Sequence, residues 1–288
     1  MAAALQPQHD ALALAGMDDI MFGRWVGLLE RRTGVVVAPQ RKPFLVGAVR
    51  ARMREVGYAN FSQYLEHISA PGAGAVEWAT LVDRLTVHET RFFRHTPSFE
   101  LIRQRWLPER LANGLAGVHA WSVGCASGEE AWSLAMVLHQ GLLGHGSKLH
   151  FGITASDVSA AAVATARAAI YPLARIEEIP AFYRSEYIEM QGEAAFSPTD
   201  SIRKRVAFAR VNLIEAAAAP LQRLNLIFCQ NVLIYFARER RRELLDGLTG
   251  LLEPGGLLVI GPGEVNGWSH PELTRVIWQG TLAYQRRD

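Results

Sequence analysis

The chain has 288 residues, of which 49% are hydrophobic and 20% charged, with a mean hydropathy of +0.05 and a formal net charge of +2. This composition supports a sizeable buried core in one large or two unequal domains and excludes intrinsic disorder. The net charge gives no argument for bulk nucleic-acid binding, and no apolar run reaches the roughly 18 residues of a membrane-spanning helix. Two cysteines, Cys125 and Cys229, are too few for a disulfide scaffold or a zinc ribbon. We therefore expect a cytoplasmic protein without a metal site.

The first part of the chain is predicted to be helical. Its opening segment, 1–16, has no Lys or Arg and is interrupted by Pro7, so it is not a signal peptide and we expect it to be flexible. Helical spacing then continues through 17–112. In its first stripe, apolar residues at i, i+4, i+7 and i+8 are Met21, Trp25, Leu28 and Leu29. We predict that residues 17–95 form an all-α N-terminal domain.

A basic stretch lies inside this predicted domain. Five positive charges precede the first acid, Glu55, and these are Arg41, Lys42, Arg50, Arg52 and Arg54. At 100° per residue, Arg50 and Arg54 flank one side of the apolar stripe of their helix, whereas Arg52 flanks the other side.

Residues 96–288 alternate between strands and helices. Runs typical of buried strands occur at 118–123, 149–154, 224–229 and 257–260, and a last strand is predicted at 274–285. Helical segments lie between them, which predicts a doubly wound, mostly parallel sheet covered on both faces. The stretch 180–210, which ends in a run at 206–208, predicts a small antiparallel insertion.

The strongest local motif is the sequence WSVGCASGEE at 121–130. A strand ends at Gly124, and a helix begins directly after Gly128, so main-chain amides and ligand space are expected at the carboxyl end of the strand. Glu129 and Glu130 would repel a phosphate but attract a cation, which suits S-adenosylmethionine and disfavours a nicotinamide dinucleotide. A purely structural turn whose acids complement the helix dipole explains these residues equally well.

Two further strand ends carry polar groups. Asp157 follows the second strand, where an acid can accept ribose hydroxyls, although capping of the next helix is an alternative role. Beyond the strand 224–229 come Gln230, Asn231 and Tyr235, which can reach the same crevice or belong to the core. The two cysteines end strands that we expect to be neighbours, so we predict that they lie close together without a disulfide.

Taken together, these segments resemble the CheR family of S-adenosylmethionine-dependent chemoreceptor methyltransferases. The matching segments, in order, are LTVHETRFFR at 85–94, GCASGEE at 124–130, SD at 156–157, VNL at 211–213 and IFCQNVLIYF at 227–236. The resemblance extends from about residue 17 to 285. It implies a Rossmann-like methyltransferase with an all-α N-terminal domain, which transfers methyl groups to glutamate side chains in the cytoplasmic methylation helices of chemoreceptors.

The resemblance also implies roles for individual residues. The cofactor-binding positions are His88, Thr90, Arg94, Gly124, Glu130, Asp157, Asn212, Leu213, Gln230 and Asn231. Arg50, Arg52 and Arg54 are implied as receptor-binding cations. His88 stands where the family usually has Asn, Gln230 where it has Arg, and Gly261-Pro262-Gly263-Glu264 where it has Gly-His-Ser-Glu.

Methyl transfer to a carboxylate needs no general base, because a glutamate with a pKa near ~4.3 is already ionised at neutral pH. The enzyme must instead align the reactants and replace the water around the carboxylate with fixed donors. Arg94 and Tyr235 are the candidate catalytic donors, although Arg94 can alternatively pair with Glu89 or Glu130.

One other function remains as an alternative, and two more are disfavoured. A non-catalytic cofactor-binding signalling protein would fit the departures at His88, Gln230 and 261–264. A nucleic-acid methyltransferase is disfavoured because the sequence shows no extended basic groove. A nicotinamide dehydrogenase is disfavoured because acids stand where its pyrophosphate would bind. We expect a monomer that does not insert into the membrane but can be recruited to receptor arrays.

Overall fold

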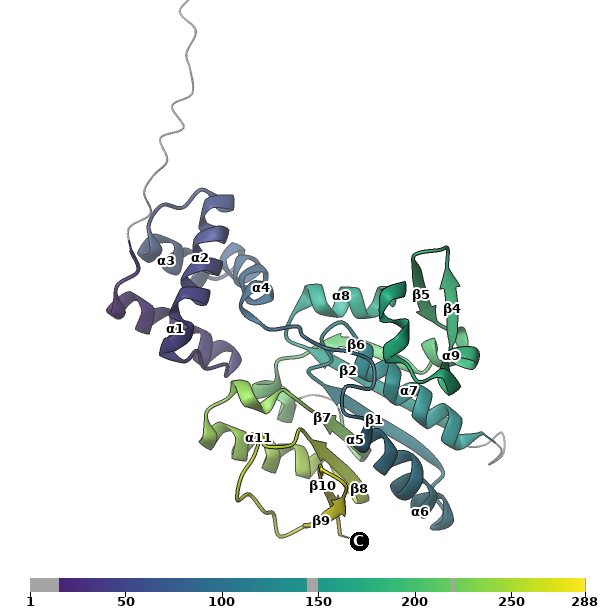
Figure 1. The fold of residues 1–288 in the computed structure, drawn as a ribbon. Coiled ribbons are helices and arrows are strands. Elements are labelled where there is room, and N and C mark those ends of the chain that lie inside the picture. The colour runs from purple at the N-terminus through teal and green to yellow at the C-terminus, as the bar shows by residue number, and fades with distance from the viewer. Residues whose placement is uncertain (1–15, 144–149, 219–220, 288) are drawn as a thin grey trace, which may run out of the picture.

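The computed structural model describes residues 16–143, 150–218 and 221–287, so the predicted flexible segment 1–16 lies almost entirely outside the described residues. Figure 1 shows a helical part built from the N-terminal third of the chain beside a larger α/β part. Its helices are α1 (Asp19–Thr33), α2 (Lys42–Val56), α3 (Phe61–Ser69) and α4 (Ala73–Leu85). A short 3-10 turn, η1 (Pro39–Arg41), precedes α2.

Local chemistry explains the limits of α1. The Asp18 carboxylate accepts a hydrogen bond from the Met21 amide at 2.7 Å, which caps the first turn. Gly34 ends the helix in the left-handed conformation, with φ of 76°. A Cβ atom at Gly34 would also lie 2.6 Å from the ring of Phe236, so this glycine is required for contact with the α/β part.

The α/β part contains a seven-stranded sheet in the order β6-β2-β1-β7-β8-β10-β9. The strands are β1 (Gly117–Val123), β2 (His150–Asp157), β6 (Val206–Arg210), β7 (Leu224–Cys229), β8 (Leu252–Ile260), β9 (Leu273–Trp278) and β10 (Thr281–Arg286). The first five strands in this order pair in parallel, whereas β9 and β10 are antiparallel. The strand predicted at 274–285 is therefore a hairpin.

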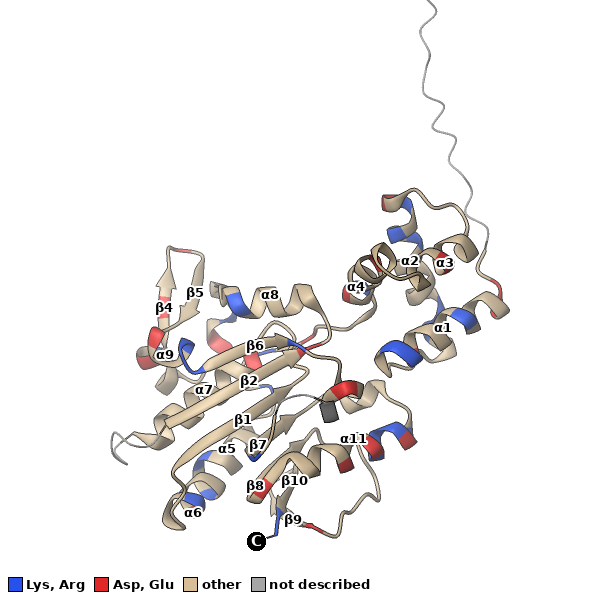
Figure 2. Ribbon diagram, turned by 180° about the vertical axis from the view of Figure 1, so that it is seen from behind, with Lys and Arg blue, Asp and Glu red and all other residues tan. Residues whose placement is uncertain are grey.

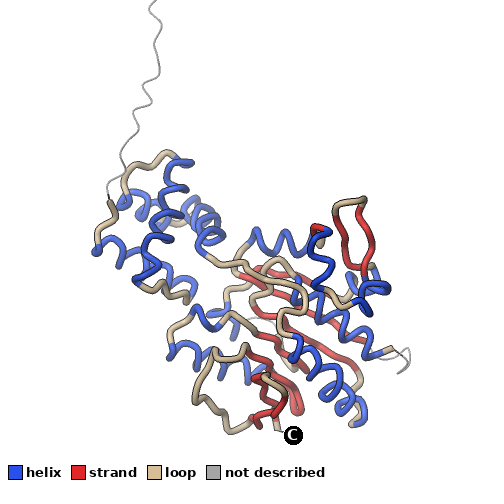
Figure 3. Tube along the Cα trace, viewed as in Figure 1, coloured by secondary structure: helices blue, strands red, loops and turns tan. Residues whose placement is uncertain are grey.

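Helices cover both faces of this sheet (Figure 3). One face packs on α5 (Thr96–Leu101), a π-helical stretch at Ile102–Trp106, α6 (Leu107–Ala112) and α7 (Glu129–Leu142), with α8 (Ala160–Ala168) beside β6. The other face packs on α11 (Arg238–Leu251). The predicted doubly wound sheet is confirmed.

The small antiparallel sheet has the order β3-β5-β4, formed by β3 (Tyr171–Pro172), β4 (Ile188–Gln191) and β5 (Ala195–Pro198). A 3-10 segment, η3 (Leu173–Glu178), and α9 (Ala181–Tyr187) connect β3 to β4, and α10 (Asp200–Arg203) follows β5. The prediction placed 206–208 in this insertion, which is wrong, because these residues belong to β6 and pair in parallel with β2. The insertion instead begins at Tyr171.

The topology fixes where a ligand can bind. The chain turns from β1 to β2 and β6 on one side, and to β7 and β8 on the other, so the crevice lies between β1 and β7. Cys125 and Cys229 stand at the ends of these neighbouring strands, and both are free and buried. Among the described residues, no helix is long and apolar enough to cross a membrane.

Candidate active site

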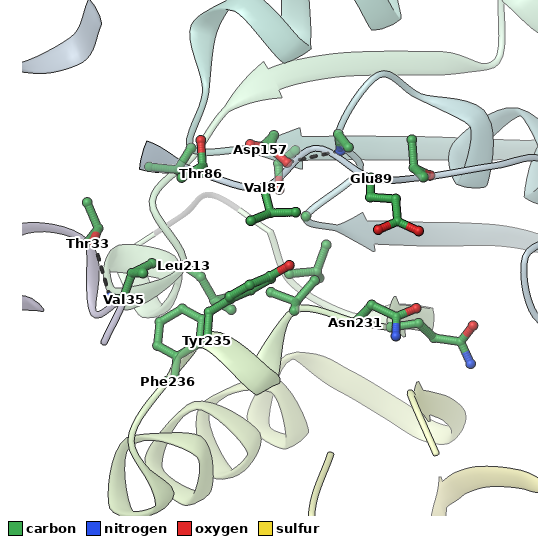
Figure 4. A pocket seen from close by; sticks show the side chains of 18 of the residues that line it. Thr33, Val35, Thr86, Val87, Glu89, Asp157, Leu213, Asn231, Tyr235 and Phe236 are labelled. Atoms are coloured by element: carbon green, nitrogen blue, oxygen red, sulfur yellow. Dashed lines mark hydrogen bonds between the residues drawn. The ribbon is translucent and has the colours of Figure 1, made fainter. Parts of the chain in front are cut away.

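A cleft of about 1260 Å³, including space open to solvent, lies between the helical part and the carboxyl ends of β1, β2 and β7. Figure 4 shows Tyr235 extending from one wall toward Val87 and Glu89, with Asp157 and Asn231 along the other sides. Every predicted cofactor residue except His88 lines the cleft, as does Tyr235. The sequence therefore placed these residues at one site although they are distributed over 146 positions, from Thr90 to Tyr235.

The glycine turn after β1 is built for close packing. Gly124 has a φ of 68°, and a Cβ atom there would lie 2.4 Å from the Val232 side chain. Gly128, with a φ of 97°, would bring a Cβ atom to 2.9 Å from Ala166. These two glycines therefore let the turn lie directly against α8 and against the loop that follows β7.

Asp157 joins this turn to the end of β2. Its Oδ2 atom accepts the Ala126 amide and its Oδ1 atom accepts the Ser159 amide, each at 2.9 Å. The N-cap of α8 is Ser159 rather than Asp157, so the capping alternative does not explain the carboxylate. Each carboxylate oxygen of Asp157 accepts one hydrogen bond from a main-chain amide. Each can therefore accept a further hydrogen bond from a hydroxyl group of a ligand in the cleft.

The two acids of the turn have different surroundings. Glu129 is fully buried and pairs with Arg175, so its charge is neutralised inside the protein. Glu130 lines the cleft and accepts the Ser122 hydroxyl at 2.8 Å. Burial and then the nearby Glu264 carboxyl raise the pKa of Glu130 to about 8, against the opposing effects of Ser122 and Arg94. Glu130 alone of this pair can therefore attract a cationic ligand.

The segment that carries Thr90 and Arg94 is held by the insertion. The Arg175 guanidinium donates to the Thr90 carbonyl at 2.7 Å, and the Glu178 carboxylate accepts the Phe92 amide at 2.9 Å. Arg175 also pairs with Glu178 at 3.0 Å. This network fixes the main chain at the cleft wall from outside the cleft.

The side chains of His88 and Gln230 form hydrogen bonds within the protein. The His88 ring lies 3.0 Å from the Thr86 hydroxyl and 3.1 Å from the Asp83 carbonyl, at the end of α4. The Gln230 amide donates to the Ser98 hydroxyl at 2.8 Å. His88 does not line the cleft, so its contact with a cofactor stays a prediction that this placement does not favour, whereas Gln230 borders the cleft.

Asn212, Leu213 and Asn231 complete the wall. The Asn212 side chain donates to the Arg32 carbonyl at 2.6 Å, which links the wall to the end of α1. Asn231 adopts the left-handed conformation, with φ of 60°, where the chain leaves β7 and bends into the loop of Tyr235. Asn tolerates this conformation better than most other residues.

Arg94 and Tyr235 face the same space. The Arg94 guanidinium donates to the main-chain carbonyl of Glu89 at 2.8 Å. This carbonyl is uncharged, so the contact does not neutralise the positive charge of Arg94. Burial raises the pKa of Tyr235, although Arg41 and Arg94 lie close enough to oppose the shift. The phenol therefore stays protonated at neutral pH and can donate a hydrogen bond.

Comparison with known proteins agrees with this geometry. Two family descriptions match the chain: "CheR methyltransferase, SAM binding domain" over residues 88–279 and "CheR methyltransferase, all-alpha domain" over residues 20–86. Chemotaxis protein methyltransferase 1 of Pseudomonas aeruginosa is 32% identical over 82% of this chain and 86% of its own. The chemotaxis protein methyltransferase of Salmonella typhimurium is 28% identical over 86% of this chain and 84% of its own.

The chain belongs to the CheR methyltransferase family. Its cofactor domain accordingly contains the sheet and the cleft, and its all-α domain supplies the opposite wall. In this CheR protein, no group of three or more His, Cys, Asp or Glu side chains within the described ranges is arranged to hold a metal ion.

The implied receptor-binding arginines have different environments, and none of them lines the cleft. Arg54 is exposed on α2, and Figure 2 marks the Lys and Arg positions along the helices of this part in blue. Arg50 is partly buried, with its guanidinium 5.8 Å from the Phe61 ring centre. Arg52 pairs with both Glu77 and Glu55, so the structure gives it a role in holding α2 to α4. A receptor contact of Arg50, Arg52 or Arg54 stays a prediction.

Sequence reasoning missed several residues that shape the CheR site. Arg41 lines the cleft from the helical part, and its place in the basic stretch was a usable signal. Arg175 donates to the carbonyl of the distant Thr90, and Arg241 donates to carbonyls of two loops, at Phe236 and at Glu264; no local motif marks either arginine. Glu264 is buried behind the cleft, where it accepts the Gly261 amide at 3.0 Å.

Proposed function

We propose that this protein transfers the methyl group of S-adenosylmethionine to glutamate side chains of chemoreceptors and produces glutamate methyl esters. The observation that carries the proposal is that Arg94, Tyr235, Glu130 and Asp157 line one cleft of a chain that matches the CheR cofactor domain. The two donors suit a carboxylate, and the two acids suit the cationic, ribose-containing cofactor.

The residues present fit that cofactor. Glu130 is the feature that favours a cation, since its poorly solvated carboxyl has a hydroxyl partner but no ion pair among the contacts described. Asp157 is placed to hold the ribose hydroxyls, while Leu213 and Val158 offer apolar surface in the same cleft. We propose that Thr90, Gly124, Asn212, Gln230 and Asn231 complete the binding site. His88 then contributes through its hydrogen bonds to α4, not through the cofactor.

When bound, S-adenosylmethionine supplies an electrophilic methyl carbon, and the carbon–sulfur bonding pair leaves with sulfur as the new carbon–oxygen bond forms. The Arg94 guanidinium would hold the incoming carboxylate, and the Tyr235 hydroxyl would orient one of its oxygens. No proton moves, so neither residue acts as a base. Holding both reactants near 3–3.5 Å in line can lower the barrier by about 7–11 kcal/mol.

The structure offers no specific support for the non-catalytic alternative. Its motivation was the unusual residues at 88, 230 and 261–264. His88 and Gln230 have satisfied polar contacts within the protein, and Glu264 remains buried against Gly261. None of these changes removes Arg94 or Tyr235 from the cleft.

The partner follows from the same proposal. We propose that the protein acts as a cytoplasmic monomer on the methylation helices of receptors and is recruited to their arrays without inserting into the membrane. The exposed Arg54, and Arg41 at the cleft, can meet the acidic groups of such helices.

The deciding experiment combines the protein with methyl-labelled S-adenosylmethionine and receptor-containing membranes. We expect label on the receptor that mild alkali releases as methanol, which identifies a carboxyl ester. The matched control uses receptors whose methylated glutamates are changed to alanine. Binding of the cofactor without any alkali-labile label would contradict the proposal and favour the docking alternative.

A further inference from the structure

We propose that Arg241 is a positioning residue for methyl transfer, because it fixes the loop that presents Tyr235 to the cleft. This inference rests on the proposed function, since Tyr235 is assigned there as the donor to the carboxylate. Arg241 itself lies on α11 and does not line the cleft.

The Arg241 guanidinium bonds to main-chain carbonyls on both sides of Tyr235. Its Nε atom donates to the Phe236 carbonyl at 2.8 Å, and one terminal nitrogen donates to the Ile234 carbonyl at 3.2 Å. The carbonyl of Tyr235 itself accepts the Val36 amide at 2.8 Å. Three successive carbonyls are therefore fixed, two by Arg241 and one by the helical part.

The remaining terminal nitrogen of Arg241 reaches a second loop. It donates to the Glu264 carbonyl at 2.8 Å. Glu264 belongs to the segment 261–264, which departs from the usual family sequence. Its buried carboxylate accepts the Gly261 amide at 3.0 Å. Burial raises the pKa of Glu264, and Arg241 is among the groups that oppose the shift. Arg241 thus joins the Tyr235 loop to this neighbouring loop.

Helix stability does not explain this arginine. Arg241 lies in the first turn of α11, and its amide bonds to the Ala237 carbonyl at 2.9 Å. A positive charge near a helix N-terminus is disfavoured by the helix dipole. Its three carbonyl partners lie outside the helix, and the fork geometry of a guanidinium is suited to several acceptors at fixed angles. The position of the charge is therefore explained by the loops that it holds.

Tyr235 needs such support. It lies in η5 (Leu233–Tyr235), a single 3-10 turn that follows the left-handed Asn231. A displacement of about 1 Å at a reacting group can lower a rate by about a hundredfold. Loss of the Arg241 bonds should therefore reduce transfer while most of the cofactor wall, which comes from the ends of β1 and β2 and from residues 211–213, is retained.

The test compares Arg241→Gln and Arg241→Lys with Arg242→Gln, a change at the exposed neighbour on α11. Each variant is first shown to be folded by its thermal unfolding, and single-turnover transfer to receptor membranes and the Kd for S-adenosylmethionine are then measured. We expect Arg241→Gln to lower the transfer rate about tenfold or more, with Kd changed less than about twofold. Arg241→Lys, which retains a charged donor, should recover part of the rate, and Arg242→Gln should match the wild type.

A double-mutant cycle with Tyr235→Phe separates positioning from general weakening. If Arg241 acts through the Tyr235 hydroxyl, Arg241→Gln should cause little further loss in the Tyr235→Phe background. An unchanged rate, a matching loss of cofactor affinity, or losses that multiply in the double variant would overturn the inference. If Arg241→Gln fails to fold, Arg241→Lys takes its place in the cycle, with the same criteria.

Amide hydrogen exchange across residues 233–237 separates this inference from the proposed function. If the wild type binds cofactor but methylates no receptor, the proposed function fails, and exchange decides whether Arg241 holds the loop. Faster exchange in Arg241→Gln, but not in Arg242→Gln, supports the positioning role. Unchanged exchange in Arg241→Gln overturns it.

Discussion

Arg52 on α2 and Glu77 on α4 meet through two parallel hydrogen bonds, from Nε to Oε1 at 2.8 Å and from a terminal nitrogen to Oε2 at 2.7 Å. The Tyr64 hydroxyl of α3 donates to the same Oε1 atom at 2.6 Å. One carboxylate therefore joins three helices of the all-α domain. Arg52, and to a smaller extent Tyr64, lowers the pKa of Glu77 against the effect of burial.

Glu77→Gln is therefore expected to destabilise this domain. It leaves the partly buried Arg52 paired only with the more exposed Glu55, so the loss should be smaller than the ~3–5 kcal/mol of a fully buried pair that is broken. Because the folded-state pKa of Glu77 is lowered, its contribution is present at neutral pH and is lost as pH falls through that value. Urea unfolding of Glu77→Gln beside Glu66→Gln, an exposed acid on α3, measures the effect. Equal midpoints for the two variants would contradict this role.

Asp157→Ala should chiefly weaken cofactor binding. If Asp157 holds the ribose in the ground state and the transition state alike, its loss removes a charge-assisted hydrogen bond worth about 1.5–3 kcal/mol, or roughly 10- to 150-fold in Kd. Calorimetric titration of S-adenosylmethionine measures this change. Because Asp157 also accepts the Ala126 amide, Asp157→Asn, which retains one acceptor oxygen, serves as the milder comparison. Wild-type affinity in both variants would refute the assignment.

Tyr235→Phe should have the opposite effect to Asp157→Ala, lowering the rate of methyl transfer and not the affinity for the cofactor. The ring is retained, so cofactor affinity should stay near the wild-type value while the single-turnover rate falls. Arg94→Ala should reduce both, because Arg94 is assigned to the cofactor and to the incoming carboxylate. A wild-type transfer rate in Tyr235→Phe would show that its hydroxyl has no part in the reaction, even with the family assignment intact.

Cofactor affinity should depend on pH through Glu130. With a pKa of about 8 in the free protein, this carboxyl is mostly protonated at pH 6, whereas a cationic ligand favours its ionised form. Binding then releases a proton, and Kd should fall as pH rises from 6 to 7.5, by up to about tenfold per unit. Titration calorimetry in two buffers of different ionisation enthalpy measures the number of protons released when the cofactor binds. The same series on Glu130→Gln should be flat, and a flat wild-type series would count against the role of Glu130.

The sheet and the cleft were predictable because both depend on local pattern. Buried strands gave short, mainly apolar runs, and the polar residues that follow β1, β2 and β7 meet at one edge of a parallel sheet. The strand β6 was assigned wrongly because it lies at the sheet edge, where Phe208 is buried and Ala207 and Arg210 are exposed. This alternation is typical of an antiparallel strand with one solvated face.

Side-chain direction was the part of the site that pattern did not reveal. Glu129 and Glu130 are adjacent in sequence, yet one pairs with Arg175 inside the protein and the other borders the cleft. His88 lies in the correct segment, but its ring finds partners at the end of α4. Such choices depend on residues from distant segments, and no spacing within the motif encodes them.

The bond between the Val36 amide and the Tyr235 carbonyl has a consequence for chimeric enzymes. Two further contacts join the helical part to the α/β part at this place. Gly34 packs on Phe236, and the Asn212 side chain donates to the Arg32 carbonyl. A helical domain grafted from another member of the family would therefore change the contacts that position Tyr235. In such a chimera, residues 32–36 should stay with the cofactor domain so that these contacts are kept.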